Sequence, residues 1–242
     1  MHKLRFFLVA IVCLTAIMFS CKEDDPAPKV FDLDYMAHIY PDNFFGKIDN
    51  PFLSLTPGST FIYTGETEEG IETIEIEVLS DTRTVMGINC VVVRDKAYLE
   101  GELIEDTYDW FAQDKDGNVW YFGEDVDNYE NGVIANHYGS WEAGVDGAQP
   151  GIIMLGNPVI GLKYRQELYS GEAEDQGEVV GNNESVQVSI GTFNGCLKIK
   201  ETNPLDPESL EYKYYARGVG LVKVEKIQDP IETEELVSYN IK

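Results

Sequence analysis

Basic side chains are scarce in this sequence. Its 242 residues include 18 Lys and Arg against 43 Asp and Glu, which gives a formal net charge of −25 at pH 7. A surface with such an excess of negative charge repels phosphate groups, so we expect no nucleic acid among its partners. Anionic lipid headgroups are repelled for the same reason, so contact with a membrane must come through a covalently attached lipid.

Long apolar runs are lacking after the N-terminus. The N-terminal run, residues 6–19, follows Lys3 and Arg5 and ends at Ser20-Cys21. It is shorter than the roughly 20 residues needed to span a bilayer, and a small residue before a cysteine is typical of a lipoprotein cleavage site. We predict a lipoprotein signal peptide over residues 1–20 and lipidation of Cys21, which would tether the protein to a membrane. The alternative is a secreted soluble protein cleaved near Ser20, with the thiol of Cys21 free.

A short linker follows the signal peptide. Residues 21–30 contain prolines and begin with the acidic run Cys21-Lys22-Glu23-Asp24-Asp25. This run resembles the export signal that follows the acylated cysteine in surface-displayed lipoproteins of Bacteroidetes-type bacteria. The resemblance implies a lipid-anchored protein of the outer membrane that faces the cell surface. A linker without that signal would leave the protein in the periplasm.

Cysteine and histidine are rare, which limits metal and redox chemistry. Besides Cys13 in the signal peptide and Cys21, only Cys90 and Cys196 occur, and they either pair or stay as two buried thiols. Neither histidine of the mature chain has a His or Cys partner at ligand spacing, so we predict no metal site. A nucleophile elbow and a phosphate-binding glycine loop are also missing, so we expect no cofactor.

Alternation of apolar and polar residues predicts an all-β, antiparallel protein. Residues 74–78 and 186–190 alternate with a period of two, which is typical of half-buried strands. Residues 107–112 and 119–122 flank an Asp-Gly turn and predict a hairpin. The turn, residues 114–118, is rich in acids, but Ala112 and Gly123 stand where a calcium loop needs oxygen ligands, so a hairpin turn is the better interpretation.

The second half of the chain repeats the order of motifs in the first. Residues 58–124 and 160–227 each predict a meander, with Cys90 and Cys196 at matching places. We expect the two meanders to join in one curled sheet, either a half-barrel or a closed barrel, because curvature protects strand edges. Residues 31–242 would then form a single β-rich domain. Residues 31–50 predict a short N-terminal helix that closes one end of the sheet.

Two long motifs carry a resemblance to a known group of proteins. They are DTYDWFAQDKDGNVWYFGE, residues 106–124, and SWEAGVDGAQPGIIM, residues 140–154. With shorter matches they extend over nearly all of residues 49–225 and resemble a family of uncharacterised secreted bacterial proteins and lipoproteins. The resemblance implies no activity, because none is assigned to the family.

Candidate site residues lie in or beside the least regular stretch, residues 123–161. Turn-forming residues and acids surround an aromatic there, and long irregular segments are often functional. We predict a ligand-binding site formed by Trp141, Glu142, Asp146, Tyr164, Arg165 and Glu167. The predicted role is binding of a glycan or an apolar small molecule. The alternatives are a carboxylate-based hydrolase of an extracellular polymer, for which an open cleft with two facing buried carboxylates is needed, or a structural envelope protein without a ligand.

Overall fold

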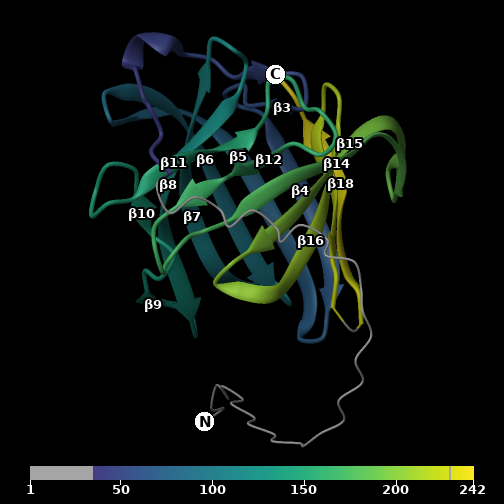
Figure 1. Cartoon of the computed structure of the whole chain (residues 1–242). Coiled ribbons are helices and arrows are strands. Elements are labelled where there is room, and N and C mark those ends of the chain that lie inside the picture. Colours follow the sequence, from purple (N-terminus) through teal and green to yellow (C-terminus); the bar gives the residue numbers. More distant parts are fainter. Residues whose placement is uncertain (1–34, 229) are drawn as a thin grey trace, which may run out of the picture. The chain divides into compact units, whose positions relative to one another are not determined.

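The computed structural model describes residues 35–228 and 230–242, and these are almost entirely antiparallel β-structure (Figure 1). The main sheet has the strand order β12-β14-β15-β16-β17-β18-β4-β5-β6-β7-β8-β11-β13. Its strands are β4 (Thr60–Thr67), β5 (Gly70–Val85), β6 (Ile88–Leu99), β7 (Glu102–Asp114), β8 (Val119–Glu130), β11 (Gln149–Met154), β12 (Lys163–Arg165), β13 (Glu167–Leu168), β14 (Gln176–Val188), β15 (Gly191–Asn203), β16 (Asp206–Ala216), β17 (Gly220–Lys226) and β18 (Glu232–Asn240). Short strands flank it: β1 (Phe44–Phe45), β2 (Asp49–Asn50), β3 (Leu53–Ser54), β9 (Val133–Asn136) and β10 (Trp141–Glu142).

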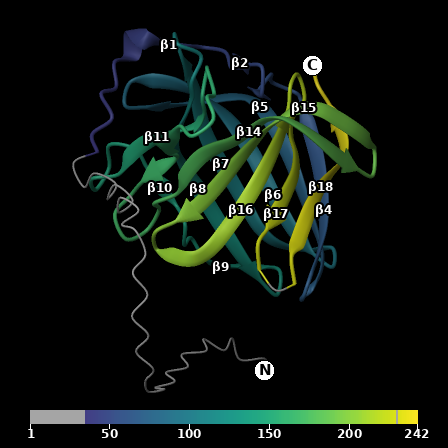
Figure 2. The ribbon, with the colours of Figure 1, turned by 45° about the vertical axis from the view of Figure 1, so that its right-hand side comes forward.

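The sheet curls into a nearly closed barrel (Figures 1 and 2). Its two ends, β12 and β13, are separated in the chain only by Gln166. β12 pairs with β14 and β13 pairs with β11, while the backbone N–H of Gln166 donates to the carbonyl of Asp175 at 2.8 Å. A single extended segment therefore bridges both edges, and the predicted all-β barrel of antiparallel meanders is confirmed.

Each half of the chain supplies a meander of consecutive antiparallel strands. β4–β8 are neighbours in order, as are β14–β17, and β18 joins the two sets by pairing with β17 and β4. Cys90 on β6 and Cys196 on β15 are both fully buried, and both are free thiols. Of the two alternatives for these cysteines, buried thiols are what the structure contains.

The predicted hairpin between β7 and β8 is confirmed, and one carboxylate organises its turn. Asp114 accepts hydrogen bonds from the backbone N–H groups of Asp116 and Asn118, each at 2.9 Å. It also accepts from the indole N–H of Trp120 at 2.8 Å. These acceptor roles give the Asp114 carboxylate a structural function in the hairpin turn.

Successive residues of the barrel strands enter different cores. Val91 and Val93 of β6 belong to the cluster inside the barrel, whereas Cys90 and Val92 pack with Trp110 in a cluster on the outer face. This is the period-2 rule for a strand with both faces covered. The sheet is therefore buried on two sides over β6–β8, and its inner side is free to form a site.

The segment before β4 closes one end of the barrel. It lies across the end where the β7–β8 hairpin turns (Figure 2) and adds Phe52 and Leu55 to the inner cluster. The buried Asn50 side chain fixes it there, because its amide N–H donates to the carbonyls of Gly117 at 2.9 Å and Leu155 at 3.1 Å. This end of the barrel, called here the capped end, is apolar.

The predicted N-terminal helix over residues 31–50 is wrong for the part that is described, residues 35–50. That part contains only a 3-10 turn, Pro41–Asn43, and short strands. Proline disfavours the helical conformation of the residue before it, and Tyr40 is extended with φ −119° and ψ 112°. Met36 and Tyr40 are 71% and 67% exposed, so no apolar face is buried to stabilise a helix. Residues 31–34 lie outside the described part of the chain.

No helix within residues 35–228 and 230–242 is long and apolar enough to cross a bilayer.

Candidate functional site

The barrel encloses a cavity of about 350 Å³. Its wall is formed by residues of β3 to β8, β11, β13 and β15 to β17, together with neighbouring loop residues. The apolar part of the lining includes Leu53, Leu55, Phe61, Ile76, Val93, Phe111, Ile153 and Leu221. The titratable part includes Tyr63, Asp95, Asp109, Tyr121, Glu124, Glu167, Asp175, Glu201, Lys213 and Tyr215. One cavity thus combines an apolar surface with many acids.

Polarity changes with depth in the cavity. Residues two apart on a strand face the same side, so each strand can place an apolar residue near the capped end and an acid further from it. Three strands do so: Val93 and Asp95 on β6, Phe111 and Asp109 on β7, and Ile199 and Glu201 on β15. The acids therefore form a layer below an apolar layer.

A β-bulge brings one of these acids inside. Asp109 pairs with Glu124 and Phe111 pairs with Tyr121, so β8 spans three residues where β7 spans two. Gly123 absorbs the extra residue with φ 125°, a conformation that other residues rarely adopt, and a Cβ there would lie 2.2 Å from the carbonyl oxygen of Trp141. Both Tyr121 and Glu124 consequently face the cavity.

The inward acids of β6–β8, Asp95, Asp109 and Glu124, are called here the acid wall. They are half-buried, because their carboxyl groups face the cavity and the barrel surrounds them. Burial, together with the neighbouring Asp109 and Glu167, raises the pKa of Glu124 to about 9. Burial likewise raises the pKa of Asp109 to about 7, although the hydroxyl of Tyr121 donates to it at 2.7 Å. The pKa of Asp95 lies well above its usual value through burial and then through Asp109.

Two more acids face the cavity from the segment that closes the barrel. Burial raises the pKa of Glu167 to about 7, with a further contribution from Asp175. Burial raises the pKa of Asp175 to about 6, while Lys213 opposes that shift. Near neutral pH the cavity therefore holds a mixture of carboxylic acids and carboxylates, which can both donate and accept hydrogen bonds.

Lys213 is the only basic residue among the described residues of the lining. It forms an ion pair with Glu201 at 2.5 Å, and the other oxygen of Glu201 accepts from the side-chain amide of Gln166 at 2.7 Å. Burial is the largest single effect and lowers the pKa of Lys213, but Glu201, Tyr215 and Glu211 together outweigh burial and leave that pKa well above its usual value. Lys213 therefore stays protonated and paired with Glu201.

The predicted site residues do not converge on one place. Glu167 lines the cavity and Tyr164 is buried in the inner cluster beside it, with its ring over Gly177. Arg165 is buried on β12 between them in sequence. These three belong to the segment that closes the barrel.

The other three predicted residues lie elsewhere. Trp141 is only 5% exposed and packs edge-to-face on Tyr121, with ring centroids 5.3 Å apart, so it is a packing residue rather than a loop aromatic. Glu142 forms an ion pair with Arg83 at 2.5 Å. Asp146 occupies an exposed turn with φ 49°.

Sequence reasoning missed the acid wall, Glu201 and Lys213. A signal for most of them exists, since Asp95, Asp109 and Glu201 are in phase with inward apolar residues of their own strands. Charged residues at core positions of a strand are rare unless they are paired or functional. The position of Glu124 could not be found in this way, because it depends on the bulge at Gly123.

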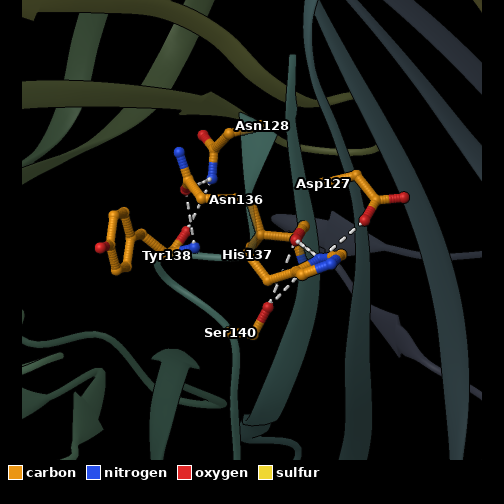
Figure 3. A network of polar contacts seen from close by, with 7 residues as sticks. Asp127, Asn128, Asn136, His137, Tyr138 and Ser140 are labelled. Atoms are coloured by element: carbon orange, nitrogen blue, oxygen red, sulfur yellow. Dashed lines mark hydrogen bonds and ion pairs between the residues drawn. The ribbon is translucent and has the colours of Figure 1, made fainter. Parts of the chain in front are cut away.

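A serine, a histidine and an aspartate also meet at the β8–β9 end (Figure 3). The Nδ1 atom of His137 lies 2.8 Å from Asp127 and 3.0 Å from the carbonyl of Val126. The Ser140 hydroxyl accepts from the N–H of Val126 at 2.8 Å. Both side chains thus hold the Val126 backbone, and this network fixes the connection after β9 rather than presenting a nucleophile.

Among residues 35–228 and 230–242, no three His, Cys, Asp or Glu side chains are arranged to hold a metal ion.

Comparison with known proteins identifies no family and two distantly similar solved structures. No protein-family model matches the chain, and no curated protein matches it. A solved structure described as a "putative lipoprotein" of Parabacteroides distasonis is 15% identical, covers 79% of this chain and 99% of its own, and has a TM-score of 0.43. A "putative exported protein with YmcC-like fold" of Bacteroides fragilis is 13% identical, covers 80% of this chain and 100% of its own, and has a TM-score of 0.46. Neither description states a ligand or an activity.

Proposed function

We propose that this protein binds a small amphipathic molecule inside its barrel. The observation that carries the proposal is the layered cavity, which is apolar at the capped end and rich in hydrogen-bonding groups below it. Its volume of about 350 Å³ lies in the range of small-molecule sites, which are mainly apolar with a few placed polar groups. Of the ligands predicted from the sequence, the apolar small molecule is therefore favoured.

The aromatic residues support this choice over a glycan. A sugar-binding site presents flat ring faces to its ligand. Here Phe111 and Tyr121 stack on each other with centroids 4.9 Å apart, and Trp141 packs against Tyr121. Phe111 and Tyr121 line the cavity, but each has a ring face covered by the other, which leaves less flat ring surface for a sugar.

The hydrolase alternative receives less support. Glycoside hydrolysis needs one protonated and one ionised carboxyl on opposite sides of the scissile bond. Asp109 and Glu124 are instead direct neighbours across β7 and β8, and the hydroxyl of Tyr121 already donates to Asp109. These two carboxyl groups therefore do not lie on opposite sides of a bound bond, since neighbouring strands of one sheet are about 4.8 Å apart.

We further propose that the protein is a lipoprotein of the outer membrane, anchored by Cys21 and facing the cell surface, and that it belongs to the family its motifs resemble. Cys21 lies outside the described residues, so the support comes from the signal peptide and the acidic linker of the sequence. Cys21→Ser should abolish incorporation of radioactive fatty acid and leave an unprocessed or soluble species. Persistent label on the variant would contradict lipidation at this residue.

Binding is tested on the full chain carrying Cys21→Ser, so that no acyl chain competes for the cavity. The uncharged fluorescent probe prodan should bind with enhanced, blue-shifted emission. Leu221→Trp should abolish this binding, because Leu221 lines the cavity and the larger side chain fills it. Ile190→Trp, at an exposed turn position, is the control and should bind normally. Lack of probe binding to the parent chain, or equal binding to both variants, would overturn the proposed function.

A further inference from the structure

The charges lining the cavity are far out of balance. Six carboxyl groups face it, and the single lysine of the described lining is already paired with Glu201. The remaining five are Asp95, Asp109, Glu124, Glu167 and Asp175. Burying several carboxyl groups in a shared space opposes their ionisation, and the lining itself offers these five groups no cation of their own.

A separate observation concerns a buried amide. Gln166 is only 2% exposed and lines the cavity. Its side-chain N–H donates to Glu201, but its carbonyl oxygen Oε1 has no hydrogen-bond partner in the described part of the chain. A buried acceptor without a donor is costly, so this oxygen indicates that a donor enters the cavity from outside.

We propose that the ligand carries an ammonium group and that the acids of the cavity bind it, with the apolar part of the ligand toward Leu53 and Leu55 at the capped end. This inference rests on the proposed function and names the chemical class of its ligand. An ammonium group has three donors and no acceptor. It thus complements a set of carboxylates and the free amide oxygen of Gln166, and it supplies the missing charge.

Depth in the barrel fixes the orientation of the ligand. Asp95 and Asp109 lie two residues further from the capped end than Val93 and Phe111, and Glu167 lies on β13, two strands along the sheet from β8. A head group at this level therefore meets carboxyl groups from several strands of the cavity wall. An alkyl or aryl tail attached to it then occupies the apolar layer, where burial contributes about 25 cal/mol for each Å² of apolar surface.

Ammonium binding should also release protons. Asp109, Glu167 and Asp175 have pKa values raised to about 7, 7 and 6 in the empty protein, and a bound cation favours their ionised forms. Affinity for an ammonium ligand should therefore increase from about pH 5 to about pH 8, below the pKa of an alkylammonium itself. A neutral ligand of the same size should show little change over this range.

Three ligands of equal chain length test the proposal: octylammonium, octanol and octanoate. Each is titrated calorimetrically into the full chain with Cys21→Ser. We expect octylammonium to bind at least about tenfold more tightly than octanol at pH 8, a factor equivalent to about 1.4 kcal/mol, and octanoate to bind more weakly than both. The advantage of octylammonium should shrink toward pH 5.

Variants locate the head group. Asp109→Asn and Glu124→Gln should each reduce octylammonium affinity by about tenfold and leave octanol affinity unchanged. Asp125→Asn is the matched control, because Asp125 follows Glu124 but is exposed on the other face of β8. Melting curves of all variants exclude loss of fold as the cause.

Each outcome decides between the two proposals. Equal binding of all three ligands, or preference for octanoate, would overturn the ammonium inference and leave the apolar binding function standing. Preference for octylammonium that survives both cavity substitutions would place the cation elsewhere and also overturn the inference. Binding of none of the three would contradict the binding function itself.

Discussion

On one side of the barrel the inward carboxylates are paired with lysines. Glu201 contacts Lys213 at 2.5 Å, and Glu234 contacts Lys226. These strands, β15–β18, are called here the paired wall. On the other side lies the acid wall of β6–β8, where no lysine or arginine of the described chain forms an ion pair with Asp95, Asp109 or Glu124.

This difference in charge pairing indicates different roles for the two walls. A paired wall satisfies its own charges and needs nothing from outside. The acid wall is held instead by aromatic packing, with Phe111 stacked on Tyr121 and Trp141 against its edge. Near neutral pH no cation of the described chain offsets the burial of its carboxyl groups, which agrees with the proposed role of this wall in binding what enters the cavity.

Removing the packing of the acid wall should have the largest effect. Trp141→Ala should lower the free energy of unfolding by about 3–5 kcal/mol, because it leaves a cavity beside Tyr121. Denaturant unfolding measures this. Tyr138→Ala, in the same segment but 82% exposed, should change it by less than about 0.5 kcal/mol. If Trp141→Ala instead left stability unchanged and abolished ligand binding, Trp141 would be a ligand contact, as the sequence predicted.

Breaking the paired wall comes next. Lys213→Met should lower the free energy of unfolding by about 3 kcal/mol, because it leaves Glu201 buried without its cation. This value is at the lower end for buried ion pairs, because the side chain of Lys213 is 26% exposed. Adding Glu201→Gln should restore most of the loss. Lys223→Met, whose partners Glu225 and Glu235 are more exposed, is the control and should cost less than about 1 kcal/mol. A double variant no more stable than Lys213→Met would show that the pair is not what holds this wall.

Much of this architecture could be predicted from the sequence, because its causes are local. Alternation identifies the strands, and the Asp-Gly turn between Asp114 and Asn118 identifies the β7–β8 hairpin. The prediction of a helix before Pro41 was wrong. The side chains of Met36 and Tyr40 have helical spacing, but both are exposed and so bury no apolar face that would stabilise a helix. The duplication of residues 58–124 and 160–227 stays a prediction about the relation between the meanders.

The site was harder to predict, because its causes are not local. Of the six residues predicted from the sequence, Glu167 lines the cavity and Tyr164 packs in the inner cluster, whereas Trp141 of the irregular stretch is buried elsewhere. Their predicted role in binding stays a prediction. The cavity arises where Gln166 bridges β14 and β11, which no pattern within one segment reveals. The sequence shows that Asp109 and Phe111 lie on the same face of one strand. Only the closed barrel makes that face the lining of a cavity and so buries Asp109.

The acid wall should give the protein an unusual pH dependence. A carboxyl with a raised pKa holds a proton in the folded state that the unfolded chain has already lost. Its stabilising contribution is full below about pH 4 and decreases as pH rises toward the folded pKa, here about 7 for Asp109 and about 9 for Glu124. We expect the free energy of unfolding to fall by at least about 2 kcal/mol from pH 5 to pH 8, which lowers the melting temperature by at least about 4 °C. Rising or constant stability over this range would contradict burial of unpaired acids.

The smallest effect is expected from changing a single residue of the acid wall, Glu124. Glu124→Gln keeps the shape of the side chain and removes the need to bury a proton-binding group, so at pH 8 it should stabilise the empty protein by about 1–2 kcal/mol. At pH 5 the gain should nearly disappear, because the pH is then close to the pKa of an unfolded Glu and little free energy is needed to protonate the buried carboxyl. Asp125→Asn, at the exposed neighbouring position, should change stability by less than about 0.5 kcal/mol at either pH. A loss of stability with Glu124→Gln at pH 8 would mean that the ionised carboxylate is held by donors of the barrel itself. The acid wall would then resemble the paired wall, and no cation would be needed to complete it.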